Sequence, residues 1–296
     1  MDKFWRSEAM LREQCPGYVS TIVEAPAPEA WLHRVHSVDY LERIRHGRLS
    51  SEERVRLGLP PGEALLTRSR LEAAGTVAAM WAARDDGMAC NLGGGTHHAF
   101  GDRGLGYCVL NDVAVAIRAW HARFPTSRVA VIDTDAHQGN GTHGIFSGDE
   151  RVFTFSIHVG RNYPAEKTPG SLDVELPRYA SGEEYLDRLA TGMEIMQQRF
   201  PQPSLTFWIA GADPHEDDRF GQLRLTDRHL AERDLQVLGW TRRQGTPCVV
   251  LYGGGYNRDR IKTARIHADT VARVLAFHQP HSPQNGPPLG QLRPSA

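Results

Sequence analysis

Residues 131–142, VIDTDAHQGNGT, place two carboxylates and an imidazole at the end of an apolar run. Asp135 and His137 are two residues apart, and on an extended chain such residues project to the same side. A third acid, Asp213 in GADPHEDD, follows another apolar run. One such Asp would be read as the cap of the next helix. Together, two carboxylates and an imidazole predict a metal site with an open position, as in catalytic zinc sites.

Further reactive side chains follow other apolar runs. Two histidines, His97 and His98, come after three glycines in GGGTHHAF, and Tyr256 comes after three more in YGGGYN. Beside a metal-activated water, histidine is a suitable general base and acid because its pKa lies near working pH. A tyrosine phenol can donate a hydrogen bond to a developing oxyanion. The combination of Lewis acid, base, proton donor and oxyanion donor indicates hydrolytic chemistry.

These residues need a framework that brings distant chain segments to one edge. Apolar runs at 87–94, 128–135, 151–159, 204–213 and 247–255 predict strands, and helical patterns occupy 64–85, 109–124, 182–200, 226–244 and 262–278. Another helix is predicted within 36–49, followed by a turn at 57–63. Strands that are apolar on both faces are typical of a parallel sheet between helical layers, hence the α/β class. Ligands bind beyond the carboxyl ends of such strands, where these polar residues fall.

Composition excludes several classes of function. The chain has 296 residues, 40% hydrophobic, with a net charge of −1. It has no Lys/Arg stripe of the kind that binds nucleic acid, no apolar run of about 18 residues that would span a membrane, and no apolar signal-peptide core near its start. Four scattered cysteines without a C-x-x-C pair favour a reducing cytoplasm. Neither GGGTHH nor GDRGLG fits a dinucleotide fingerprint. We predict a single domain over residues 1–278 and a disordered tail over 279–296.

Six motifs, in order and with matching spacing, resemble the histone deacetylase family over about residues 30–278. They are NLGGGTHHAF, GLGYCVLNDVAVA, VIDTDAHQGNGT, FSIHVGRNYP, GADPHEDDRFG and YGGGYN. DAHQGNG and DRFG are more similar to the class IV branch and its bacterial relatives than to class I. The resemblance implies a three-layer α/β/α arginase/deacetylase fold with a central, mostly parallel sheet of eight strands. It also implies hydrolysis of an acylated amine, above all N6-acyl-lysine.

The resemblance also implies a role for each matching position. Asp135, His137 and Asp213 would bind Zn²⁺, or Fe²⁺, since one imidazole and two carboxylates suit both metals. His97 and His98 would lie beside the attacking water, with His98 as general base and acid, supported by Asn140. Asp133 would support His97 and share a structural K⁺ with Ser156 and the backbone of Ile157. Tyr256 would polarise the acyl carbonyl. Tyr107 and Tyr163 would form the walls of the substrate slot, Gly106 its floor and Phe220 part of its mouth.

Asn140 and the rim residues after Asp213 affect the activity and specificity that the resemblance implies. Asn140 stands where many members of the family have Asp, and a neutral partner stabilises the imidazolium form of His98 less, which would shift the pH optimum. The rim residues His215, Glu216 and Asp217 are interpreted as solvated loop residues, although they could select cationic substrates.

Other functions stay open as alternatives. An acetylated polyamine or a small metabolite could replace acyl-lysine as substrate. An arginase-like manganese ureohydrolase is disfavoured because Asn140 replaces a bridging carboxylate and Tyr256 would have no role. A catalytically silent module that binds acyl-lysine is disfavoured because every named catalytic group is present. The sequence leaves the acyl length and the oligomeric state undetermined.

Overall fold

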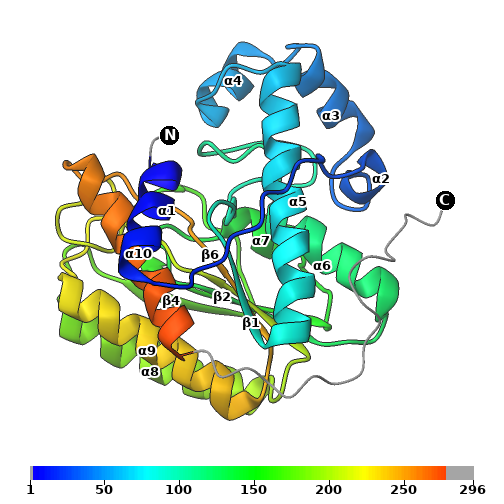
Figure 1. The fold of residues 1–296 in the computed structure, drawn as a ribbon. Coiled ribbons are helices and arrows are strands. Elements are labelled where there is room, and N and C mark those ends of the chain that lie inside the picture. Colours follow the sequence, from blue (N-terminus) through cyan, green and yellow to red (C-terminus); the bar gives the residue numbers. More distant parts are fainter. Residues whose placement is uncertain (1–2, 278–296) are drawn as a thin grey trace.

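The computed structural model describes residues 3–277, and the predicted disordered tail at 279–296 lies outside the described residues (Figure 1). The elements, in chain order, are α1 (Lys3–Gln14), α2 (Glu29–Leu32), α3 (Val38–Arg45), α4 (Ser51–Leu57), α5 (Glu63–Asp86), β1 (Met88–Asn91), α6 (Asp112–Arg123), β2 (Val129–Asp133), α7 (Asn140–Ile145), β3 (Val152–Val159), β4 (Leu172–Leu176), α8 (Gly182–Arg199), β5 (Leu205–Ile209), α9 (Asp227–Gln244), β6 (Cys248–Leu251) and α10 (Arg260–Phe277).

The strands form one sheet in the order β1-β6-β5-β2-β3-β4, and every pairing is parallel. The described residues thus give six strands, not the eight that the resemblance implied. Two long segments, after β1 and after β5, run as loops that make only isolated bridges such as Leu105–Cys108 and His215–Leu225. Strand β4 was not predicted, because this edge strand is half exposed and carries Asp173 and Glu175 among its five residues.

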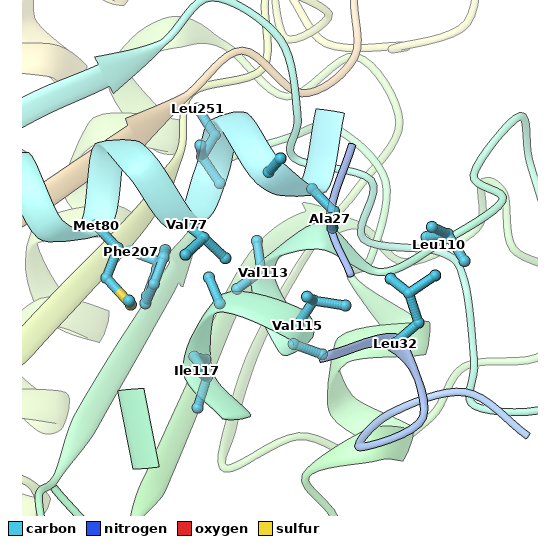
Figure 2. Close-up of a cluster of buried hydrophobic side chains, with 14 of the residues drawn as sticks. Ala27, Leu32, Val77, Met80, Leu110, Val113, Val115, Ile117, Phe207 and Leu251 are labelled. Atoms are coloured by element: carbon cyan, nitrogen blue, oxygen red, sulfur yellow. The ribbon is translucent and has the colours of Figure 1, made fainter. Parts of the chain in front are cut away.

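Alternate residues of the central strands enter two separate cores, as the pleat requires. Val129 and Val131 of β2 face the core under α5 and α6, where Figure 2 shows Val77 and Met80 packed near Phe207. Ala130 and Ile132 face the core under α8, α9 and α10. Helices therefore cover both faces of the sheet, which confirms the predicted three-layer α/β/α arrangement (Figure 1).

The chain changes direction across the sheet between β2 and β5, which lie side by side. From β2 the chain continues to β3 on one side, whereas from β5 it continues to β6 on the other. Loops that diverge from adjacent parallel strands leave a crevice at the carboxyl ends, where ligands bind in such sheets. Asp135 and His137 follow β2, and Asp213 follows β5. The predicted metal ligands therefore flank this crevice.

The first quarter of the chain is more helical than its pattern indicated. Of the four short helices before α5, only α3 was predicted, within 36–49. Helix α1 packs against α10 (Figure 1), and α4 begins at a capping box formed by Ser50 and Glu53. The predicted strands at 204–213 and 247–255 overshoot β5 and β6, because their last residues belong to the site loops. No helix among residues 3–277 has the length and apolar character needed to cross a bilayer.

Candidate active site

Asp135, His137 and Asp213 meet at the crevice between β2 and β5. One ligand atom from each residue lies within 4.8 Å of the others. The Nδ1 atom of His137 is 3.0 Å from both Asp135 Oδ1 and Asp213 Oδ2. Both carboxylates are fully buried and His137 is 9% exposed, so the three groups form a compact cluster in which only the histidine reaches solvent.

Backbone amides fix the two carboxylates. Asp135 accepts hydrogen bonds from the amides of His137 (3.0 Å) and Gly254 (2.7 Å), and Asp213 accepts one from Ala136 (2.9 Å). A Cβ at Gly254 would lie 2.6 Å from Asp135 Oδ2 and would also overlap Asp213. Only glycine allows the backbone to approach the carboxylates this closely. The glycines of YGGGYN thus hold the ligands as well as turn the chain.

The charges of this cluster fit a divalent cation. Burial, reinforced by Asp135, raises the pKa of Asp213 to about 7. Although burial opposes its ionisation, His97 and His137 hold the pKa of Asp135 well below its usual range. Burial opposes protonation of His137, but both carboxylates raise its pKa well above the ordinary value. Two buried carboxylates share one imidazole proton, so a cation that took its place would be bound by three donors.

His97 and His98 have different partners, and their pKa values differ accordingly. The Nδ1 atom of His97 is 2.7 Å from Asp133 Oδ2, whereas His98 donates from Nδ1 to Asn140 Oδ1 at 2.8 Å. Burial opposes the charge on His97, but Asp133 raises its pKa to about 9. Burial, with His97 and His137 nearby, lowers the pKa of His98 well below its ordinary value. The pair therefore combines a cationic imidazole with a neutral one whose Nε2 can accept a proton.

The histidine loop is anchored by a group that the sequence analysis did not single out. Asp112, the first residue of α6, accepts hydrogen bonds from the amides of Gly95 (3.0 Å) and Thr96 (2.7 Å) and from the hydroxyls of Thr76 and Thr96. On the other side, the amide of Thr142 donates to the carbonyl of His97 at 3.1 Å. Asp112 had no sequence signal beyond its place at a helix start, where carboxylates are common.

The predicted slot residues surround the histidines and form an aromatic rim. Tyr163 lies edge-on to His98, with ring centroids 5.0 Å apart, and a Cβ at Gly106 would be 2.8 Å from atoms of both rings. Tyr256 packs against Tyr107 (6.0 Å) and Phe220 (5.6 Å). The four aromatic residues are 37–52% exposed, so they lie at the surface, whereas the predicted metal ligands are buried.

Tyr107 reaches its place through a left-handed backbone conformation with φ of 67°. Such a conformation is uncommon for a non-glycine residue and needs support from its surroundings. Its amide donates to the carbonyl of Leu57 at 2.9 Å, and its ring covers Gly58, where a Cβ would be 2.6 Å from the ring. Helix α4, which was not predicted, therefore supports Tyr107, one of the two predicted slot walls.

The residues predicted to hold a monovalent cation lie on adjacent strands. Asp133 at the end of β2 is the direct cross-strand partner of Ser156 on β3, with Ile157 next along the strand. The Oγ atom of Ser156 is 3.0 Å from Nδ1 of His158, and Asp133 Oδ1 accepts from the amide of Asp135 at 3.1 Å. The structure brings these residues together, while their binding of K⁺ remains a prediction.

One rim prediction is wrong for His215, which is only 2% exposed, while Glu216 and Asp217 are exposed as expected. The imidazole of His215 turns inward because polar groups surround it there. Its Nδ1 lies 3.2 Å from Asn257 Nδ2, and its Nε2 lies 3.3 Å from Asp227. His215 therefore links the loop after Asp213 to the loop that carries Tyr256.

A family model described as histone deacetylase domain matches residues 3–272. The chain is 36% identical to an uncharacterised protein of Picosynechococcus over 94% of this chain and 91% of that protein. It is 33% identical to histone deacetylase 2 of Arabidopsis thaliana over 69% of this chain and 53% of that one. It is 30% identical to the acetoin utilization protein AcuC of Staphylococcus aureus over 77% of this chain and 64% of that protein. The chain thus spans less than two thirds of the length of histone deacetylase 2 and of AcuC.

Solved structures agree in architecture. The crystal structure of an HDAC homolog complexed with SAHA has a TM-score of 0.76 at 23% identity, covering 94% of this chain and 77% of that one. The structure of an HDAC homolog from Aquifex aeolicus has a TM-score of 0.74 at 22% identity, covering 94% and 77%. These likenesses confirm the arginase/deacetylase fold that the motifs implied. Given the match of the family model to nearly the whole described chain, this protein belongs to the histone deacetylase family.

Proposed function

We propose that this protein is a zinc-dependent hydrolase that removes the acyl group from N6-acyl-lysine. The observation that carries the proposal is the meeting of three groups of residues at one crevice. These are the buried ligand trio, a histidine pair whose pKa values are pushed apart, and a tyrosine in the rim above them. Neighbouring titratable groups whose pKa values are shifted in opposite directions are typical of the acid and base of an active site.

The ligand trio would hold the metal ion. Zn²⁺ and Fe²⁺ both accept one imidazole and two carboxylates, and the remaining positions would be open to water and substrate. A bound ion would supply Lewis-acid chemistry, polarising the acyl carbonyl and making the attacking water more acidic. A K⁺ ion at Asp133, Ser156 and the carbonyl of Ile157 is part of the same proposal.

The histidines would move the proton. His98 is neutral and donates from Nδ1 to Asn140, so its Nε2 can take the proton from water and pass it to the leaving amine. His97, kept cationic by Asp133, would counter the negative charge that develops as the carbonyl is attacked. Hydrogen bonds that fix each ring by its Nδ1 leave both Nε2 atoms to face the reaction.

Tyr256 would donate its phenol hydrogen to the oxyanion. Burial, with Tyr107, Asp135 and Asp213 in electrostatic reach, raises the pKa of Tyr256, so the phenol stays protonated. The aromatic walls suit a neutral acylated amine, since a free ammonium would lose its hydration there without a partner.

Four free cysteines agree with action in the reducing cytoplasm, which is part of the proposal.

The test is hydrolysis of lysine peptides that carry acyl groups from acetyl to myristoyl, with an acetylated polyamine alongside. Each substrate is assayed with the purified protein, after chelation, and after zinc or iron(II) is restored. We expect metal-dependent release of the acyl group from at least one peptide. Turnover of the polyamine alone would replace lysine as substrate. A metal-loaded protein that hydrolyses none of them would overturn the proposal.

A further inference from the structure

Tyr256 needs support that its own loop does not give. The residue follows Gly253 and Gly255, both with positive φ, so the preceding backbone has wide conformational freedom. Its ring packs against Tyr107 and Phe220, which are themselves about half exposed. Exposed aromatic neighbours on loops constrain a ring weakly, because local motions of loops cost little free energy. The ammonium of Lys3 also lies 5.7 Å from the centroid of the Tyr256 ring and donates to the carbonyl of Gly253 at 3.0 Å. These contacts leave the backbone amide of Tyr256 to be fixed by another group.

Asp218 meets that need from a different loop. Its Oδ2 accepts a hydrogen bond from the backbone amide of Tyr256 at 2.5 Å, across 38 residues of sequence. Its Oδ1 accepts from the amides of Phe220 (2.8 Å) and Gly221 (3.0 Å). One carboxylate thus binds three backbone amides on two loops. Charge-assisted hydrogen bonds of this kind are about twice as strong as neutral ones.

Other contacts join the same two loops around Asp218. Asp218 and Asn257 form an antiparallel bridge, and the carbonyl of Tyr256 accepts from Nε of Arg219 at 3.1 Å. The amide of Arg258 donates to the carbonyl of Asp217 at 3.3 Å. The loop that starts at Asp213 therefore contacts the tyrosine loop at Tyr256 and at the two residues that follow it, and the Asp218 carboxylate binds the tyrosine amide directly.

We propose that Asp218 is a positioning residue that acts through Tyr256, holding the phenol in reach of the metal ligands. The inference rests on the proposed function and adds a residue to it. The bonds to Phe220 and Gly221 alone would make Asp218 an ordinary turn-forming residue, as aspartates often are. The bond to Tyr256 has no part in that turn, and it is this bond that couples the ligand loop to the oxyanion donor.

The first test compares Asp218→Asn with Glu216→Gln. Both substitutions remove one acid from the same loop, but Glu216 is exposed and lies outside the contacts that carry the inference. In Asp218→Asn an amide group replaces one acceptor oxygen, so at least one of the three backbone bonds is lost. We expect kcat to fall about tenfold with KM and metal content unchanged, since small displacements of a catalytic group cost this much or more. Glu216→Gln should match the wild type.

The second test repeats Asp218→Asn in a Tyr256→Phe background. If Asp218 acts through the phenol, the Asp218→Asn substitution should lower kcat only slightly in the Tyr256→Phe background, because the hydroxyl that Asp218 positions is already absent. An equal loss in both backgrounds would overturn the inference, as would wild-type activity in both Asp218→Asn and Asp218→Ala. If the alanine variant fails to fold, the nearly isosteric asparagine variant decides the matter.

A third measurement needs no substrate. Protein labelled with fluorotyrosine gives a ¹⁹F resonance for Tyr256 that the Tyr256→Phe variant identifies. We expect this line to shift or broaden in Asp218→Asn and to stay unchanged in Glu216→Gln. An unchanged line in folded Asp218→Asn and Asp218→Ala would overturn the positioning role. If the wild type hydrolyses none of the acylated amines, the proposed function fails, while this spectrum still reports on the positioning.

Discussion

The ligand side and the aromatic side of the site are built in different ways. Asp135 and Asp213 are fully buried at the ends of central strands, and backbone amides fix their oxygens. The four rim aromatics are 37–52% exposed and belong to loops. Groups that must hold a small ion need sub-ångström placement, which strand ends provide, whereas groups that receive a longer substrate can tolerate local motion. Tyr256 is the exception, because it lies on the more exposed side but would take part in the proposed chemistry.

The largest expected effect comes from the ligand side. Asp135→Ala should abolish stoichiometric metal binding and activity together, because it removes one of three ligands and leaves the amides of His137 and Gly254 without their acceptor. Metal content by mass spectrometry and turnover of the best substrate check this. Glu216→Ala, an exposed acid of the rim, is the matched control and should keep both. Retained metal in Asp135→Ala would mean that the trio is not the metal site.

Tyr256→Phe should separate chemistry from metal binding. Loss of one oxyanion donor typically lowers kcat by about 10²–10³-fold. The ring contacts with Tyr107 and Phe220 do not involve the hydroxyl, so folding and metal content should stay at wild-type levels. Steady-state kinetics with metal analysis on the same preparation gives both quantities. Near wild-type kcat would show that the phenol takes no part in the reaction.

Asn140→Asp should shift the pH dependence of kcat/KM without changing the metal content. Burial first, then His97 and His137, lowers the pKa of His98, and Asn140 offers only a neutral oxygen at 2.8 Å. A carboxylate in that place stabilises the imidazolium form and raises the pKa of His98. A base works only when unprotonated, so the rising acidic limb of kcat/KM should shift to higher pH. A limb that stayed in place or shifted to lower pH would contradict His98 as the base.

The ligand side was largely predictable from sequence. Asp135, His137 and Asp213 follow runs of apolar residues, and because ligands bind beyond the carboxyl ends of parallel strands, the sequence predicts that the three lie together. Short-range spacing and strand order suffice because buried strands leave few choices of register. Of the six described strands, the sequence pattern misses only β4, an edge strand whose Asp173 and Glu175 break the apolar run.

The aromatic side was predictable only in its residue types. Nothing in the sequence marks Asp218 as the partner of an amide 38 residues away, or Leu57 as the acceptor that holds Tyr107 in a left-handed conformation. His215 was misread for the same reason, since a histidine in an acidic loop gives no sign that Asn257 will lie against it. Contacts between loops depend on tertiary packing rather than on period or propensity, so sequence pattern cannot supply them.

Tyr107→Phe should have the smallest effect, although it is the same chemical change as Tyr256→Phe on a residue of similar exposure. The ring, its place over Gly58 and the hydrogen bond from the Tyr107 amide to Leu57 all survive the substitution. We expect kcat/KM to stay within about twofold and the free energy of unfolding within about 0.5 kcal/mol of the wild type, as for most surface substitutions. A tenfold loss at Tyr107 would instead mean that its hydroxyl contacts the substrate. More than one hydroxyl of the aromatic rim would then act on the substrate, rather than that of Tyr256 alone.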